Sequence, residues 1–154
     1  MKYLFIVQGE GRGHLTQAIS LSQMLRHHGH EVVEVLVGKS SNREIPTFFL
    51  EKIGAKVKTF ASPNFCYGRD HKKVKLAKSI LLNITVKKLR EYRKSVNLIH
   101  RHIQKMEPDV VINFYEILAG LVNLRFREHV PFVCIAHQFL MKHPDYQYGS
   151  GTRK

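Results

Sequence analysis

Glycines alternate with larger polar residues close to the N-terminus. Residues 9–14 read GEGRGH, with Gly9, Gly11 and Gly13 placed around Arg12 and His14. Glycine lets a backbone turn tightly and approach a ligand closely. A helix beginning here would offer free N–H groups and a positive dipole end to an anion. The pattern predicts a ligand-binding loop, and the alternative is a tight strand-to-helix turn that binds nothing.

Two common nucleotide-binding motifs do not fit this loop. The dinucleotide motif is G-x-G-x-x-G, followed by an acidic residue at the end of the next strand. Here His14 takes the place of the third glycine, and the next expected strand ends in Gly38-Lys39. A P-loop needs Gly-Lys-Ser/Thr at a set spacing, which this segment lacks. We therefore expect no nicotinamide cofactor and no P-loop nucleotide.

His14 is the residue of this loop best suited to acid–base chemistry. A histidine side chain has an ordinary pKa of about 6.5, so it can accept a proton at neutral pH. We expect His14 in the first turn of a helix, with its ring exposed to a cleft beside Glu116 or His137. The alternative is a loop histidine that only hydrogen-bonds to the backbone.

Other polar residues follow later strands of the expected sheet and would reach the same edge. Glu116 can pair with His14 or bind a substrate hydroxyl, and the alternative is a carboxylate that favours a helix N-terminus. His137 and Gln138 follow the last expected strand, where they are either ligand-binding or ordinary polar loop residues. No metal site is expected, because the remaining histidine clusters have no carboxylate or cysteine to complete them: His27, His28 and His30, and His100 with His102.

The elements that must position these residues alternate along the chain. Apolar runs without alternation indicate strands buried on both faces, as in a parallel sheet. Strands alternating with helices predict an α/β fold with a Rossmann-like, doubly wound parallel sheet. The expected strands are 3–7, 32–37, 57–60, 109–113 and 131–136, and the expected helices are 15–28, which Gly29 ends, 44–53 and 117–126.

A long segment of helical periodicity separates the third and fourth expected strands. Residues 71–106 contain neither proline nor glycine. A single helix of that length would measure about 50 Å, at 1.5 Å per residue. Since this exceeds the span of a small domain, we expect a break near residues 83–85, which read Asn-Ile-Thr and are weak helix formers.

Positive charge is concentrated in the same region. The chain has a formal net charge of +13, and 12 of its 25 lysines and arginines lie between residues 69 and 105. The segment Arg69–Lys94 can hold the chain against an anionic membrane surface, or it can be a solvated helix face. Nucleic acid is an unfavoured partner, because aromatic residues are not interleaved with the basic ones.

Composition places the chain among ordinary globular domains. With 154 residues and 44% hydrophobic residues, it can bury one core and is not intrinsically disordered. Two cysteines, Cys66 and Cys134, do not make a disulfide scaffold, and Cys134 lies in an apolar run where we expect it buried. No apolar run is long enough to span a bilayer or form a signal peptide, so a cytoplasmic protein is expected.

Three motifs together resemble the opening of the glycosyltransferases of the GT-B fold. They are the GEGRGH loop, residues 113–116 (NFYE) where one group of these enzymes has D-F-E-P, and the pair His137-Gln138. The resemblance covers the whole chain and is nearest to a group of uncharacterised members with a G-x-G-x-G-H opening. It is more distant to the lipid I N-acetylglucosaminyltransferases. Gln17 and Asn113 depart from the arginine and aspartate usual in that group.

The resemblance implies a fold, a reaction and a second domain. Residues 1–154 would be the N-terminal, acceptor-binding half of a two-domain architecture, and the donor-binding half would lie outside this chain. It implies sugar transfer from a nucleotide sugar to a hydroxyl acceptor, which can be lipid-linked. His14 would be the base, and Gly9, Gly11, Arg12, Gly13, Glu116, His137 and Gln138 would bind substrate. The alternatives are a non-catalytic module that binds phosphate or nucleic acid, and half of a nucleotide-sugar epimerase. The isolated half would be inactive, with no cofactor and no metal.

Overall fold

The computed structural model describes residues 1–63, 85–136 and 145. The strands are β1 (Lys2–Gln8), β2 (Glu31–Lys39), β3 (Val57–Ala61), β4 (Val110–Phe114) and β5 (Phe132–Cys134). The helices are α1 (Arg12–His27), α2 (Thr47–Lys52), α4 (Val86–Met106) and α5 (Ile117–Phe126).

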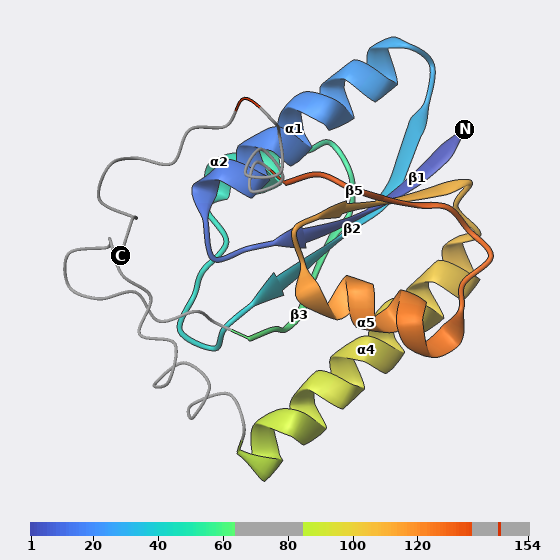
Figure 1. Ribbon diagram of the computed structural model, residues 1–154. Coiled ribbons are helices and arrows are strands. Elements are labelled where there is room, and N and C mark those ends of the chain that lie inside the picture. Colours follow the sequence, from blue (N-terminus) through green and yellow to red (C-terminus); the bar gives the residue numbers. More distant parts are fainter. Residues whose placement is uncertain (64–84, 137–144, 146–154) are drawn as a thin grey trace.

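The five strands form one parallel sheet in the order β3-β2-β1-β4-β5. Helices cover both faces of this sheet, with α1 and α2 on one side and α4 and α5 on the other (Figure 1). The predicted α/β, doubly wound parallel fold is therefore confirmed. The sheet order changes direction at β1 and β4, and at such a point a crevice opens beyond the carboxyl ends of the strands.

The apolar run of β1 serves both faces of the sheet. Leu4 and Ile6 pack with α4 and α5, whereas Phe5 and Val7 pack with α1 and α2. All four side chains are fully buried. Successive side chains of a strand point to opposite faces, so a strand covered on both sides must be continuously apolar.

Helix boundaries follow local signals in the sequence. α1 ends before Gly29, as predicted, and Gly29 has a φ of 74°, in the left-handed region that favours glycine. α4 begins after Thr85, whose side chain caps it by accepting a hydrogen bond from the amide of Lys88, so the helix starts at the predicted break. Residues 71–84 of the predicted helical segment lie outside the described residues.

Two elements are shorter than predicted. α2 begins at Thr47 rather than residue 44, because Pro46 disfavours helical geometry in the residue before it. β5 ends at Cys134 rather than residue 136, since the paired strand β4 ends at Phe114 and the chain then turns away. The expectation that Cys134 is buried was wrong: β5 is an edge strand, and both Val133 and Cys134 are exposed.

A charged cluster lies under α4, which the sequence did not predict. Glu34 of β2 is fully buried, and its carboxylate oxygens lie 3.0 Å from Nζ of Lys58 and 2.5 Å from Nδ1 of His102. The sequence alone placed His102 in a histidine pair that lacks the further ligands of a metal site. Here it pairs with a buried acid, which joins α4 to the sheet.

Candidate functional site

The glycine loop lies at the carboxyl edge of the sheet and is tied to the end of β2. The amide of Gly9 donates to the carbonyl of Gly38 over 2.7 Å. The carboxylate of Glu10 accepts from the amide of Ser40 over 2.6 Å, and Nε of Arg43 donates to the carbonyl of Gly9 over 3.3 Å. These three hydrogen bonds hold the first half of the loop against the neighbouring strand.

The three glycines of the loop differ in their surroundings. A Cβ at Gly9 would lie 2.8 Å from Cγ1 of Val37 and 2.9 Å from the carbonyl oxygen of Gly38, so packing requires glycine there. A Cβ at Gly11 or Gly13 would have no atom within 4 Å. Within residues 1–63 and 85–136 the space over Gly11 and Gly13 is therefore open, at the start of a helix that finds neither a side-chain cap nor an acidic residue in its first turn there.

His14 is the third residue of α1, as predicted, but it is not exposed. Only 6% of the residue is accessible, and its ring stacks on Tyr115 with 5.6 Å between the centroids and 26° between the planes. Tyr115 itself is 39% exposed, so its ring lies on the solvent side of His14. The prediction of an exposed ring was wrong because Tyr115, which the sequence reasoning passed over, projects from the β4 loop onto it.

The turn between β4 and α5 is held by reciprocal hydrogen bonds. The side-chain oxygen of Asn113 accepts from the amide of Glu116 over 2.7 Å, and its side-chain nitrogen donates to the carbonyl of Glu116 over 3.1 Å. An aspartate at this position could accept the first bond but could not donate the second. Asn113 thus has a structural role at a position where the resemblance left its role open.

Glu116 is buried at the centre of this turn, with 1% of the residue exposed. Its Oε1 accepts from the hydroxyl of Ser62 over 2.7 Å and from the amide of Leu118 over 3.1 Å, so it caps α5. Its Oε2 lies against the Cα of Gly38 and has no hydrogen-bond partner among the residues that the structure describes. Burial raises the pKa of this carboxyl from 4.5 to about 7, although the hydrogen bonds from Ser62 and Leu118 act in the opposite direction. Glu116 thus lies at a helix N-terminus, and its role in substrate binding stays a prediction.

A cavity of about 270 Å³ opens beside this turn. Its walls come from the ends of β1, β3, β4 and β5 and from the start of α5, which places it at the carboxyl edge of the sheet. Sequence reasoning missed Ser62 and Tyr115, although both directly follow strands, which is the signal that could have found them. Among the residues that line the cavity are Ser62, Asn113, Tyr115 and Glu116.

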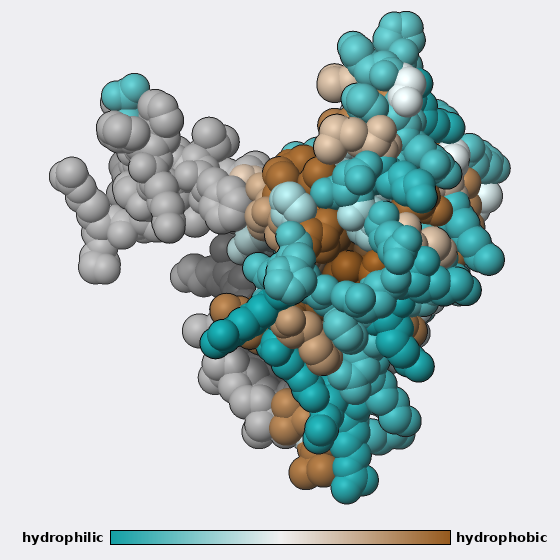
Figure 2. Space-filling model, turned by 90° about the vertical axis from the view of Figure 1, so that its right-hand side faces the viewer, coloured by the Kyte–Doolittle hydropathy of each residue, from teal (hydrophilic) through white to brown (hydrophobic). Residues whose placement is uncertain are grey.

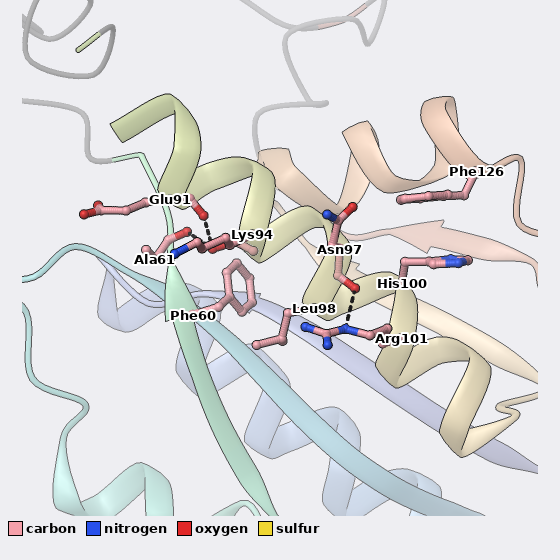
Figure 3. Close-up of a pocket in the computed structure, with 10 residues that line it drawn as sticks. Phe60, Ala61, Glu91, Lys94, Asn97, Leu98, His100, Arg101 and Phe126 are labelled. Carbon is pink, nitrogen blue, oxygen red and sulfur yellow. Dashed lines mark hydrogen bonds between the residues drawn. The ribbon is translucent and has the colours of Figure 1, made fainter. Parts of the chain in front are cut away.

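A larger groove of about 790 Å³ lies elsewhere, along α4. In Figure 3 its apolar walls come from Phe60 of β3, Leu98 of α4 and Phe126 of α5, and Lys94 and Arg101 of α4 lie along it. It runs along the middle of α4, and β3 is the one strand whose end lines it among the described residues. We place the candidate site at the smaller cavity, because it is lined by Gln8, which directly precedes the glycine loop, and by Tyr115 and Glu116 of the β4 turn.

Some predicted site residues are not brought together by the described structure. Arg12 is exposed at the start of α1, and His137 and Gln138 lie outside the described residues. No group of three or more metal-ligating side chains forms within residues 1–63 and 85–136. Of the helices that the structure describes, none has the length and apolar character to cross a bilayer.

Comparison with known proteins gives a family and a structural relative. A family model described as glycosyl transferase family 1 matches residues 1–154. No curated protein matches the chain significantly. The fold is similar to MurG of Acinetobacter baumannii, with a TM-score of 0.52 and 16% identity over 86% of this chain. The match spans 34% of the MurG chain, so the present chain corresponds to about a third of that protein's length. The five-stranded parallel fold thus matches part of a GT-B enzyme, and the chain belongs to glycosyl transferase family 1.

Proposed function

We propose that this chain is the acceptor-binding part of a glycosyltransferase that moves a sugar from a nucleotide sugar to a hydroxyl acceptor. The observation that carries the proposal is the position of His14 in a chain of this family. His14 lies at the start of α1, where the loops after β1 and β4 lead to opposite faces of the sheet. Ligands of open α/β sheets bind at such a point.

In this proposal the residues of the edge have separate tasks. The open space over Gly11 and Gly13 receives the acceptor, and the uncapped amides of the first turn of α1 bind its polar groups. His14 takes the proton from the acceptor hydroxyl as that oxygen attacks the sugar, and the nucleotide leaves with the bonding electrons. A general base of this kind contributes about 10²–10⁴-fold to the rate. The donor would be bound by a further domain, so the chain alone would bind acceptor without turnover.

Binding can be tested on the chain itself by nitrogen-15 NMR with a panel of monosaccharides and methyl glycosides. The amide signals of Gly11, Gly13 and His14 should shift with added sugar, and Gly13→Leu should weaken binding by filling the open space. Ser20→Leu, at an exposed position of the same helix, is the matched control and should bind as the wild type. Shifts confined to other surfaces, or unchanged binding by Gly13→Leu, would contradict the acceptor site. Sugar transfer by the 154-residue chain alone would contradict the two-domain mechanism.

A peripheral membrane contact is proposed for the start of α4. Val86 and Leu89 are exposed there, beside the exposed cations Lys87, Arg90 and Arg93. Figure 2 shows brown apolar residues next to teal hydrophilic ones at the lower tip, the end at which α4 begins in Figure 1. Basic residues near an anionic surface contribute about 1 kcal/mol each. Co-sedimentation should therefore require anionic vesicles and weaken with salt, and equal binding to neutral vesicles would contradict it.

A further inference from the structure

Tyr115 has an unusual backbone conformation for a bulky residue. Its φ is 60°, in the left-handed region. Within the described residues, the other non-glycine residues with positive φ are Glu107 and Arg127, and both are helix C-caps, where this conformation is common. Tyr115 instead stands between a strand and the N-cap of α5. A strained residue of this kind persists only when its surroundings hold it, and such residues concentrate at functional sites.

The residues on both sides of Tyr115 hold it in place. Asn113 binds the amide and the carbonyl of Glu116 through its side chain. Glu116 is in turn held by Ser62 from β3 and by the amide of Leu118 in α5. Tyr115 cannot return to an ordinary φ without breaking several of these buried hydrogen bonds.

The strain has one visible consequence, which is the placement of the Tyr115 ring on His14. The two rings are stacked at 5.6 Å, and they join the β1 loop to the β4 turn. The tyrosine ring is the more exposed of the two, so it shields the imidazole from solvent. The same tyrosine lines the 270 Å³ cavity.

We infer that Tyr115 is a positioning residue for His14. Its ring fixes the plane of the imidazole and screens it from bulk water, and Asn113 acts on His14 through Tyr115. This inference rests on the proposed role of His14 as a base, which requires one ring orientation toward the acceptor. Nothing in the stacking requires the tyrosine hydroxyl, so the aromatic ring alone should suffice.

The test measures how fast diethyl pyrocarbonate modifies His14 in the 154-residue chain, read by peptide mass mapping. His27, exposed at the other end of α1, is the internal reference. His14 should be protected in the wild type and in Tyr115→Phe, which keeps the ring. Protection should be lost in Tyr115→Ala, with the rate at His14 rising toward that at His27, whose own rate stays unchanged.

Three results would overturn the inference. His14 could remain protected in Tyr115→Ala, it could lose protection in Tyr115→Phe, or it could react rapidly in the wild type. If Tyr115→Ala does not fold, Tyr115→Gly replaces it, because glycine accepts this φ without strain while still removing the ring. The assay reports no catalysis, so failure of His14 as a base would appear in the sugar-binding and kinetic experiments and leave the protection result standing.

Discussion

The buried carboxyl of Glu116 should make the stability of this protein depend on pH in an uncommon direction. Its pKa is raised from 4.5 to about 7 by burial. Between these two values the folded protein keeps the proton that the unfolded chain has lost. The folded state then binds more protons than the unfolded state, so the free energy of unfolding falls as pH rises through this window. Below pH 4.5 this contribution is fully present, and above pH 7 it is lost.

The magnitude follows from the two pKa values. One pKa unit corresponds to about 1.4 kcal/mol, so ionising Glu116 in the folded state should lower stability by about 3 kcal/mol in total. Glu116→Gln removes the titration while its side-chain oxygen can still accept from Ser62 and Leu118. The amide nitrogen would take the place of Oε2, which already lacks a partner, so the variant and the protonated wild type should have similar stability near pH 5.

The assay is urea unfolding of both proteins by circular dichroism from pH 5 to pH 8. The difference in stability between variant and wild type should shift by about 2–3 kcal/mol in favour of glutamine across this range, because part of the total effect is already lost at pH 5. Taking the difference cancels the titration of the other carboxylates, which both proteins share. Glu51→Gln, at an exposed position of α2, is the matched control and should show no such shift. A pH-independent difference for Glu116→Gln would show that Glu116 is ionised throughout, and the reasoning from burial would be wrong.

Three further predictions concern packing and charge, each measured by thermal and urea unfolding. Gly38→Ala should destabilise the fold by about 1–3 kcal/mol, because its Cβ would overlap Oε2 of Glu116. Gly11→Ala places its Cβ in open space, so it should change stability by less than about 1 kcal/mol. Equal effects of the two substitutions would contradict this reasoning. Asn113→Asp should cost about 1–3 kcal/mol by leaving the Glu116 carbonyl without its donor, and Asn42→Asp on an exposed loop is the control. His102→Leu should cost about 3 kcal/mol because it removes one of the two side chains that contact the buried carboxylate, and no loss would mean that Lys58 alone suffices for Glu34.

The fold was predictable because parallel strands covered on both faces appear in the sequence as continuous apolar runs. Such strands are apolar where both faces are covered, as in residues 4–7 of β1 and 110–112 of β4. The predictions that were wrong, on β5 and Cys134, depend on which strands lie next to one another, and the sequence does not show this. The length of β5 depends on where β4 ends, and the exposure of Cys134 depends on its strand lying at an edge.

The candidate site was predictable in position but not in its contacts. Residues that follow parallel strands must meet at one edge, which located His14 and Glu116 correctly. The stacking of His14 depends on the left-handed backbone conformation of Tyr115. A sequence indicates that conformation mainly where it has glycine or asparagine, so it could not be predicted at a tyrosine. The hydrogen bond from Ser62 to Glu116 joins residues 54 positions apart. Whether two such residues come into contact depends on the order of the strands in the sheet, which the sequence did not reveal.

The glycines of the GEGRGH loop fall into two groups, of which packing explains one and not the other. Gly9 is required because Val37 and the Gly38 carbonyl leave no room for a side chain, and hydrogen bonds tie this half of the loop to β2. Gly11 and Gly13 meet no such constraint, since nothing lies within 4 Å of a Cβ there and neither has a positive φ. Packing within the described residues therefore explains the first half of the motif and leaves the second half free to face a ligand. His14, the proposed base, directly follows Gly13. The glycines that packing does not require are therefore the ones next to the proposed base.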